Sequence, residues 1–338
     1  MPKILIVSNR FLDTSCSDEN TFGPGFNSYG PCELRVAQAA YREDSGRWSV
    51  SLLPEDYSTQ DYCQSSRFLF QQIVADINSG MPDAQNWVVF IPGYCSPLKE
   101  GLDKSLELLK AHQTNVILFS WPSDPRLPAI SPIDKYFRTQ EAATLSASAL
   151  VRAIEGINRV LIQPARAISG NRSKFSVNLL AHSLGSHVVQ HYINLASPHS
   201  GDLSMFDNVI LHQPDVNFAG HSEWVKRIRA RAKSYITTNK FDEILKNVSN
   251  LVNPTRLGQV SSGAVSVMPD VLHVDFAEAR NVNNQHWFFG DFENNVIQMF
   301  CTKVLHGEPG EVALYQDPSQ EGRYQCYAPP SFPPFPGR

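Results

Sequence analysis

The chain has 338 residues, of which 42% are hydrophobic and 18% are charged. This is the composition of an ordinary globular protein with a large core. The net charge of −4 excludes a general attraction to nucleic acid or to an anionic membrane surface. No apolar run reaches the roughly 18 residues that a membrane-spanning helix needs, so we expect no membrane span.

The cysteines and the first residues bear on cellular location. The six cysteines lie at positions 16, 32, 63, 95, 301 and 326, without a C-x-x-C spacing. We therefore expect free thiols rather than a disulfide framework. Residues 1–10 become polar too early for an export signal. Together these features predict a cytoplasmic protein.

The first quarter of the chain, residues 1–85, has the least regular pattern. Strands are expected at 3–7 and 48–53, separated by a turn-rich segment at 23–30 that contains three glycines. Apolar residues recur at helical spacing over 66–79, which predicts a helix. The glycines lack the G-x-G-x-x-G spacing of a dinucleotide-binding loop.

From residue 86 onward, apolar strands alternate with amphipathic helices. We expect strands at 87–91, 115–119, 175–181, 208–212, 234–238 and 271–276. The expected helices span 98–112, 140–157, 186–195, 223–232, 243–251 and 291–304. This alternation predicts an α/β fold with a mostly parallel central sheet and helices on both faces. We expect one domain over 1–306, comprising 1–85 and the regular part 86–306, and a Pro-rich tail over 307–338.

The pentapeptide Ala181-His182-Ser183-Leu184-Gly185 joins an expected strand to an expected helix. A serine at such a sharp turn is typical of a nucleophile elbow, which needs small residues two positions before and after it. Ala181 and Gly185 satisfy this requirement. The alternative is an ordinary junction at which Ser183 caps the helix.

A nucleophilic serine needs a histidine base and an acid that orients it, in the chain order Ser, acid, His. Asp242 follows the expected strand 234–238, and His286 lies in the loop after the last expected strand. Asp242 could equally cap the helix that follows it. Asp215, which follows the strand 208–212, is an alternative acid. We expect His182 to shape the elbow rather than to act as the base.

An acyl-transfer site also needs backbone N–H groups that bind the developing oxyanion. Leu184, the residue after the serine, is one expected donor. The second is expected in the loop after the strand 87–91, where Gly93 allows a close approach of the backbone and Tyr94 or Cys95 supplies the N–H group.

Several strings along the chain carry a resemblance to a known family. They are Val7-Ser8-Asn9-Arg10, Phe119-Ser120-Trp121-Pro122-Ser123, the elbow, Gln213-Pro214-Asp215-Val216-Asn217, Asp242-Glu243-Ile244-Leu245, Arg256-Leu257-Gly258 and Gln285-His286-Trp287. In these strings the chain resembles an uncharacterised bacterial family of α/β-hydrolases, a domain of unknown function. The resemblance implies the alpha/beta-hydrolase fold and a Ser–Asp–His triad, with no assigned substrate. The chain departs from the family at Pro92-Gly93-Tyr94-Cys95, where the family pattern is His-Gly-Tyr-Asn.

These features predict a serine hydrolase that cleaves a carboxylic ester through an acyl-enzyme on Ser183. Asp242 and His286 are the expected acid and base, and no metal or organic cofactor is implied. The expected partner is a small ester or lipid-like substrate. The expected lining comes from short loops that carry Trp121, Phe218, Trp224, Phe241 and Trp287, each of which could equally be a core residue. The alternative is a non-catalytic binding or scaffold protein that retains the fold.

Overall fold

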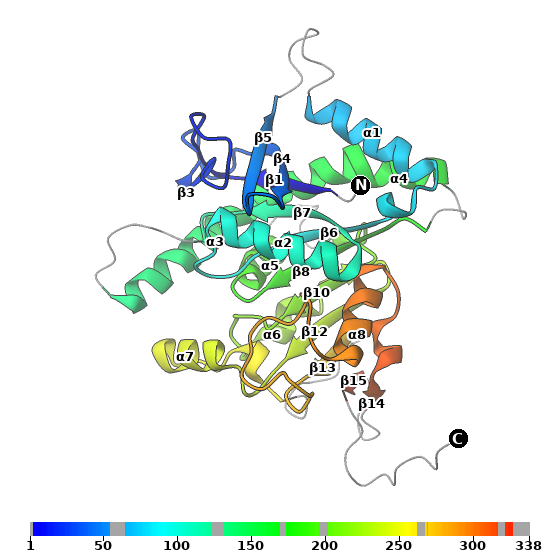
Figure 1. Ribbon diagram of the computed structural model, residues 1–338. Coiled ribbons are helices and arrows are strands. Elements are labelled where there is room, and N and C mark those ends of the chain that lie inside the picture. The colour runs from blue at the N-terminus through cyan, green and yellow to red at the C-terminus, as the bar shows by residue number, and fades with distance from the viewer. Residues whose placement is uncertain are drawn as a thin grey trace.

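The computed structural model describes residues 3–54, 65–123, 131–169, 174–195, 202–261, 268, 270–316 and 322–326. Among these residues, eleven strands form one large sheet (Figure 1). The strands of this sheet are β1 (Ile4–Ser8), β4 (Arg35–Arg42), β5 (Arg47–Leu53), β6 (Asn86–Ile91), β7 (Asn115–Ser120), β8 (Ser176–His182), β10 (Asn208–His212), β12 (Lys233–Thr238), β13 (Val271–Asp275), β14 (Tyr315–Gln316) and β15 (Arg323–Gln325). Their order across the sheet is β14-β15-β13-β12-β10-β8-β6-β7-β1-β4-β5.

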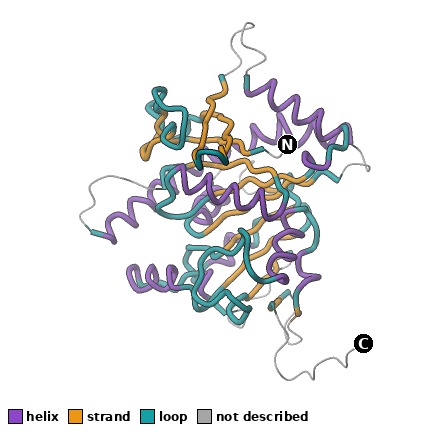
Figure 2. Tube along the Cα trace, in the orientation of Figure 1, coloured by secondary structure: helices purple, strands orange, loops and turns teal. Residues whose placement is uncertain are grey.

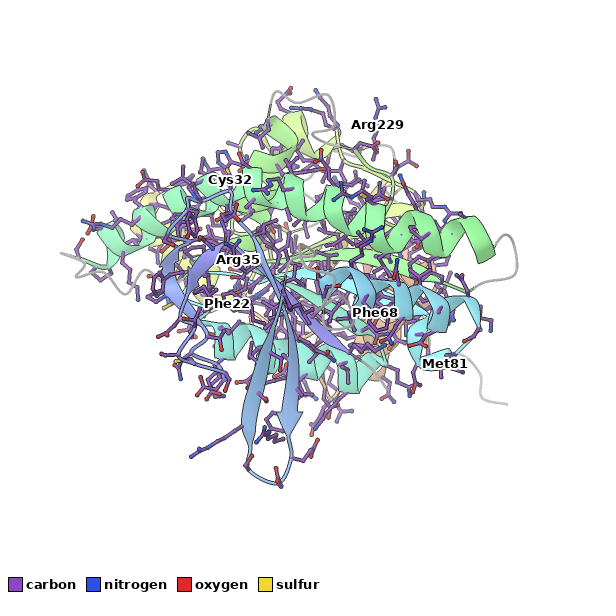
Figure 3. All side chains as sticks on the ribbon, turned by 90° about the horizontal axis from the view of Figure 1, so that it is seen from above. Phe22, Cys32, Arg35, Phe68, Met81 and Arg229 are labelled. Atoms are coloured by element: carbon purple, nitrogen blue, oxygen red, sulfur yellow. The ribbon has the colours of Figure 1, made fainter. Side chains whose placement is uncertain are left out.

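The centre of the sheet is parallel. From β15 to β1, each strand pairs in parallel with its neighbour, and antiparallel pairing is confined to β14 at one edge and the β4–β5 hairpin at the other. This hairpin projects at the edge of the molecule in Figure 3. The carboxyl ends of the parallel strands therefore meet along one edge, where ligands bind in sheets of this kind.

Helices cover both faces of the sheet (Figure 2). They are α1 (Ser66–Asn78), α2 (Leu98–His112), α3 (Pro132–Ile157), α4 (Gln163–Ser169), α5 (Gly185–Asn194), α6 (His221–Val225), α7 (Glu243–Val252) and α8 (Asn295–Leu305). One buried apolar cluster joins α1, α3, α4, α5 and α6 to one face, and a second joins α2 and α8 to the other face. No helix within the described ranges is both long and apolar enough to cross a membrane.

Alternate residues of the central strands supply the two clusters. Val89 and Ile91 of β6 face the first, and Val88 and Phe90 face the second. A parallel strand that is buried on both faces must be apolar at every position, which explains the continuous apolar runs in the sequence. The mostly parallel sheet with helices on both faces is therefore confirmed.

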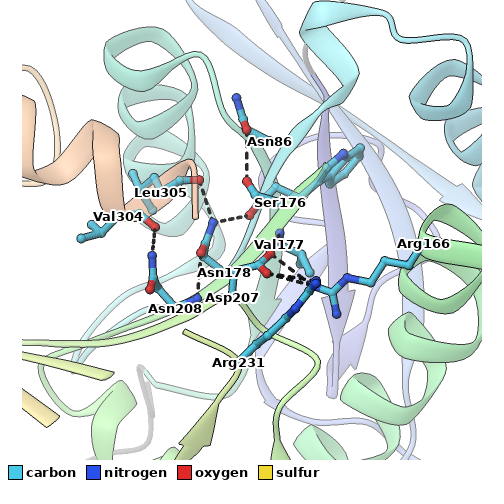
Figure 4. A network of polar contacts seen from close by, with 11 residues as sticks. Asn86, Arg166, Ser176, Val177, Asn178, Asp207, Asn208, Arg231, Val304 and Leu305 are labelled. Carbon is cyan, nitrogen blue, oxygen red and sulfur yellow. Dashed lines mark hydrogen bonds and ion pairs between the residues drawn. The ribbon is translucent and has the colours of Figure 1, made fainter. Parts of the chain in front are cut away.

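Buried polar side chains hold the amino edge of the sheet to α8 (Figure 4). Asn178 of β8 donates to the carbonyl of Leu305 at 2.7 Å, and Asn208 of β10 donates to the carbonyl of Val304 at 2.9 Å. These bonds satisfy the last carbonyls of the helix, which have no partner within it. The end of α8 is thus bonded to the amino edge of the sheet, and the candidate site lies at the carboxyl edge.

Five local predictions differ from the structure, and the smallest difference is that α8 begins at Asn295, four residues after the expected start at 291. The segment expected to be a turn-rich loop contains β3 (Phe22–Phe26), which pairs with β2 (Arg10–Leu12). The expected helix over 223–232 is wrong: α6 ends at Val225, and β11 (Arg229–Ala230) pairs with β9 (Asp202–Leu203). β11 is a strand because it pairs with a segment that is distant in sequence, and the apolar periodicity of residues 223–232 cannot show such a partner.

The other two differences are extensions. α3 begins eight residues before the expected start at 140, because Ser131 caps it and Pro132 suits its first turn. The sheet continues past residue 306, since β14 and β15 add two strands beside β13. Residues 327–338, which include most of the prolines of the expected tail, lie outside the described residues.

Candidate active site

Ser183 lies between β8 and α5 in a strained turn. Its φ angle is +53°, in the left-handed region that a residue with a side chain rarely adopts. Two backbone bonds hold it there: the Ser183 N–H donates to the His212 carbonyl at 2.9 Å, and the Ser183 carbonyl accepts from the Asp215 N–H at 3.1 Å. The turn is therefore imposed by the neighbouring strand β10, and an ordinary helix cap would not need this conformation.

Two glycines let the backbone pass close to the serine. A Cβ atom on Gly185 would lie 2.4 Å from the Ile91 carbonyl oxygen, so no larger residue fits there. A Cβ atom on Gly93 would lie 2.8 Å from Ser183 Cβ and 3.3 Å from Ser183 Oγ. The loop after β6 thus runs directly against the serine side chain, as expected from Gly93.

Asp242 and His286 form a close pair. Asp242 Oδ2 lies 2.5 Å from His286 Nδ1, and Asp242 Oδ1 accepts from the Leu245 N–H at 3.0 Å. The carboxylate therefore caps α7 and contacts the histidine at the same time. Asn239 reinforces the arrangement, because its amide donates to the carbonyls of Asn283 and Gln285 and so ties the loop after β12 to the histidine loop.

His286 lies beside the residue that precedes the serine. The rings of His182 and His286 are 4.7 Å apart between centroids, and His182 Nε2 is 3.0 Å from the His286 carbonyl oxygen. Burial, followed by the nearby His286, lowers the pKa of His182 well below its usual value. A buried, neutral His182 is suited to shaping the elbow, whereas His286 has the carboxylate partner that a base needs.

Asp215, the alternative acid, has other partners. Its Oδ1 atom lies 3.1 Å from Arg256 Nε, and both of its oxygens accept from the Tyr136 hydroxyl at 3.1 and 3.0 Å. Burial raises the pKa of Asp215, and the Arg256 guanidinium opposes this effect. The carboxylate is thus engaged in a buried ion pair, and the geometry favours Asp242 as the acid.

A hydrogen bond in the loop after β6 removes one of the expected oxyanion donors. The Cys95 N–H donates to the Ser123 carbonyl at 2.7 Å, so it is already used within the fold. Cys95 is therefore not suited to bind an oxyanion, which corrects its place among the expected donors. Tyr94 and Leu184 remain as candidates, and Leu184 lies at the N-terminus of α5, where the helix dipole favours negative charge.

Arg10 is a buried residue that joins two loops of the carboxyl edge, and sequence reasoning did not single it out. Its guanidinium is 1% exposed and donates to the Ser96 carbonyl at 2.6 Å, to Ser120 Oγ at 2.9 Å and to Ser123 Oγ at 3.1 Å. It thus joins the loop after β6 to the loop after β7. A lone arginine near a strand end is usually exposed, so only its occurrence in the family string Val7-Ser8-Asn9-Arg10 could have drawn attention to it.

The comparisons agree with this architecture. The model of the family described as alpha/beta hydrolase of unknown function (DUF900) matches residues 71–284, well over half of the chain. The chain belongs to this family. No curated protein matches the chain. Among solved structures it is similar to Aspergillus fumigatus lipase B, with 15% identity, a TM-score of 0.41 and coverage of 68% of this chain and 54% of that one. The chain thus spans about half the length of that lipase.

The aromatic residues expected to line the site differ in their burial, and Phe218 is partly buried against the first apolar cluster. Trp121 and Trp224 are buried core residues, and the Trp121 ring nitrogen donates to the Pro92 carbonyl at 3.0 Å. Trp287 packs against His182, with ring centroids 4.9 Å apart, and is held by Glu107. Phe241 is 48% exposed. Trp287 therefore supports the histidine loop, and of the two alternatives for Trp121 and Trp224, site lining or core, the structure shows the core.

A hollow of about 750 Å³ lies beside the loop after β7. The residues that line it come from β3, from the end of β7 and from the first half of α3; they are Pro24, Gly25, Phe26, Pro122, Asp134, Phe137, Arg138, Glu141, Ala142 and Leu145. The lining mixes apolar side chains with charged ones. Pro122 precedes Ser123, which Arg10 joins to the loop after β6, and none of Ser183, Asp242 and His286 is among the residues that line this hollow.

Proposed function

We propose that the protein is a serine hydrolase that cleaves a carboxylic ester through an acyl-enzyme on Ser183. The observation that carries the proposal is the Asp242–His286 pair, with its 2.5 Å contact, placed beside the strained turn of Ser183. Nucleophile, base and acid follow three different strands of one parallel sheet, at the edge where such sheets bind ligands. Membership of an alpha/beta hydrolase family supports the same chemistry.

In the acylation step, Ser183 Oγ attacks the ester carbonyl carbon while His286 Nε2 takes the hydroxyl proton. Asp242 accepts a hydrogen bond from His286 Nδ1–H, which holds the tautomer and stabilises the imidazolium. The backbone N–H groups of Leu184 and Tyr94 bind the oxyanion of the tetrahedral intermediate. His286 then returns the proton to the alcohol oxygen as the C–O bond breaks.

In the deacylation step, water repeats the attack on the acyl-enzyme. His286 removes a proton from the water, the C–O bond to Ser183 Oγ breaks, and the proton passes to the serine. The products are the free acid and the regenerated enzyme.

Covalent labelling with a fluorophosphonate probe tests this proposal. The probe should label the wild type on Ser183, and Ser183→Ala should lose both the label and nearly all hydrolysis of short-chain p-nitrophenyl esters. Ser186→Ala is the matched control, because Ser186 is a fully buried serine one turn into the same junction; this variant should keep labelling and turnover. Equal labelling of wild type and Ser183→Ala would refute Ser183 as the nucleophile, and a wild type without label or turnover would indicate a binding protein that retains the fold.

A further inference from the structure

Gln213 combines a strained backbone conformation with a buried side chain that the fold leaves without a partner. It follows β10 directly, it is fully buried, and its φ angle is +46°. Within the part of the chain that the structure describes, neither its amide oxygen nor its amide nitrogen has a hydrogen-bond partner. A strained backbone and an unsatisfied buried amide both destabilise a fold, and such residues concentrate at functional sites.

The backbone on either side of Gln213 contacts the nucleophile. The carbonyl of His212, the preceding residue, accepts from the Ser183 N–H, and the N–H of Asp215, two residues later, donates to the Ser183 carbonyl. The Gln213 N–H itself donates to the carbonyl of Thr237 in β12, the strand that leads to Asp242. Gln213 therefore lies between the nucleophile turn and the strand that carries the acid.

The strain at Gln213 is held in place by close packing. A Cβ atom on Gly258 would lie 2.5 Å from the Gln213 carbonyl carbon, so the Gly258 backbone presses directly on this residue. The Gly258 N–H also donates to the carbonyl of Pro214, the next residue. With contacts to β8, β12 and Gly258, the backbone of Gln213 has no room to relax into an ordinary conformation.

Buried amide side chains with structural functions in this protein make hydrogen bonds. Asn178 and Asn208 donate to the end of α8 (Figure 4). Gln85, a buried glutamine before β6, donates to the carbonyls of Ile77 and Met81 at 2.9 and 3.1 Å. Gln213 differs from all three, because its amide has no partner among the described residues and the backbone on either side of it bonds Ser183.

We infer that Gln213 is a substrate-binding residue whose amide hydrogen-bonds a polar group of the ester held at Ser183. This inference rests on the proposed function and names its substrate class. An amide both donates and accepts, and a hydroxyl group complements it in both directions. The substrate is therefore an ester that carries a hydroxyl group near the scissile bond, on the acyl or on the alcohol side. A plain hydrocarbon at this position leaves the amide unpaired, and sites with unpaired polar groups reject such ligands.

Two matched pairs of esters test the substrate class. The acyl pair is p-nitrophenyl 3-hydroxybutyrate and p-nitrophenyl butyrate, and the alcohol pair is glyceryl monobutyrate and propyl butyrate. The wild type should favour the hydroxylated member of at least one pair by about 10-fold or more in kcat/KM. Gln213→Met, which keeps the volume and removes the amide, should reduce that preference to about 2-fold or less.

Thermal unfolding separates substrate binding from a structural function. Gln213→Met should keep or raise the Tm, because it removes an unsatisfied buried amide. The matched control Gln85→Met should lower the Tm, because it breaks two hydrogen bonds, and should keep the wild-type preference between esters.

The outcomes distinguish this inference from the proposed function. A wild type that reacts with the fluorophosphonate on Ser183 but shows no preference in either pair refutes the inference alone. A Gln213→Met variant that keeps the preference, or that loses as much Tm as Gln85→Met, also refutes it. A wild type that the probe does not label refutes the proposed function, and the inference with it.

Discussion

Asp242 illustrates how one side chain serves two purposes. One carboxylate oxygen caps α7 and the other contacts His286. The two interpretations of this residue in the sequence, a helix cap and a triad acid, are therefore compatible, because a carboxylate has two oxygens that accept in different directions. Capping also fixes the rotamer of the side chain, which in turn fixes the position of the histidine ring.

Exchanging each candidate acid for its amide separates their functions. Asp242→Asn should lower kcat by about 10⁴-fold, because the amide cannot stabilise the imidazolium and favours the wrong tautomer. Its stability should change little, since asparagine caps a helix as well as aspartate does. Ester turnover and urea unfolding of the purified variant measure the two effects.

Asp215→Asn is the comparison for that experiment. This change leaves the buried Arg256 guanidinium without its carboxylate, and breaking a buried pair in this way costs about 3–5 kcal/mol of unfolding free energy. At a temperature where the variant is folded, its kcat should stay within about 10-fold of the wild type, since its contact is with Arg256 and Tyr136 rather than with His286. A larger loss of kcat from Asp215→Asn than from Asp242→Asn would reverse the assignment of the acid.

At the scale of elements, the loops at the carboxyl edge are held to one another. Arg10 bonds the loop after β6 and the loop after β7, and Ser123 Oγ in turn donates to the Ser96 carbonyl at 2.7 Å. Gly93 and Tyr94 belong to the first of these loops. Their position against Ser183 therefore depends on a side chain from the start of the chain.

Replacing Arg10 should impair catalysis more than substrate binding. Arg10→Lys keeps the charge, but a single ammonium cannot reproduce the planar set of bonds to three oxygens. We expect kcat to fall by about 10- to 100-fold with KM nearly unchanged, because a displaced oxyanion donor acts on the transition state. A boronic acid that mimics the tetrahedral intermediate should bind more weakly by a similar factor.

Arg35→Lys is the control for Arg10. Arg35 is a partly buried arginine of β4 that pairs with Glu33, distant from Ser183 along the sheet. It should keep the wild-type kcat and the wild-type affinity for the boronic acid. If Arg10→Lys lowers the Tm but leaves kcat and boronate affinity unchanged, Arg10 is a structural residue only.

The strength of local signals decided which elements could be predicted. The central parallel strands and the helices α1, α2, α5 and α7 lie close to their expected positions. Apolar residues follow one another along each of these strands or recur at helical spacing along each helix. β11 could not be predicted, since its two residues form a strand only by pairing with Asp202 and Leu203. The early start of α3 could have been predicted from Ser131 and Pro132, a cap followed by proline.

At the scale of the whole molecule, the protein buries several neutral histidines. Burial is the first cause in each case: it lowers the pKa of His112 to about 4 and that of His273 to about 3, and it lowers the pKa of His182 and of His212 well below the usual value. Unfolding exposes these rings to water, where their pKa returns to about 6.5. The unfolded state therefore binds more protons than the folded state below pH 6.5.

This difference predicts a loss of stability in mild acid. Because the folded pKa values are depressed, the stability is complete above pH 6.5 and falls as the pH drops from 6.5 toward 4. Each such histidine contributes a slope of up to about 1.4 kcal/mol per pH unit. Urea unfolding at pH 7.5, 6.0 and 5.0 measures it. His273→Leu removes one of these groups and should give a shallower slope; a slope equal to that of the wild type would contradict this account.

The sequence alone determined the fold class and the candidate residues at the carboxyl edge of the sheet. These candidates came from features of short segments: apolar periodicity, turn residues and the small residues around Ser183. Such features predict the local backbone geometry. The choice among side-chain partners was not local. Asp242 contacts a histidine 44 positions away, and Arg10 bonds a serine 110 positions away.

Only the tertiary structure showed which polar partners Asp242, Asp215, the Cys95 N–H and Arg10 have, and that the Gln213 amide has none among the described residues. In each case the deciding fact is whether a polar group has a hydrogen-bond or ion-pair partner in the folded chain. A carboxylate beside Arg256 and one beside His286 look alike in sequence, and so do a bonded glutamine and an unbonded one. Burial makes the difference matter, because a polar group removed from water must be bonded by the protein or by what it binds.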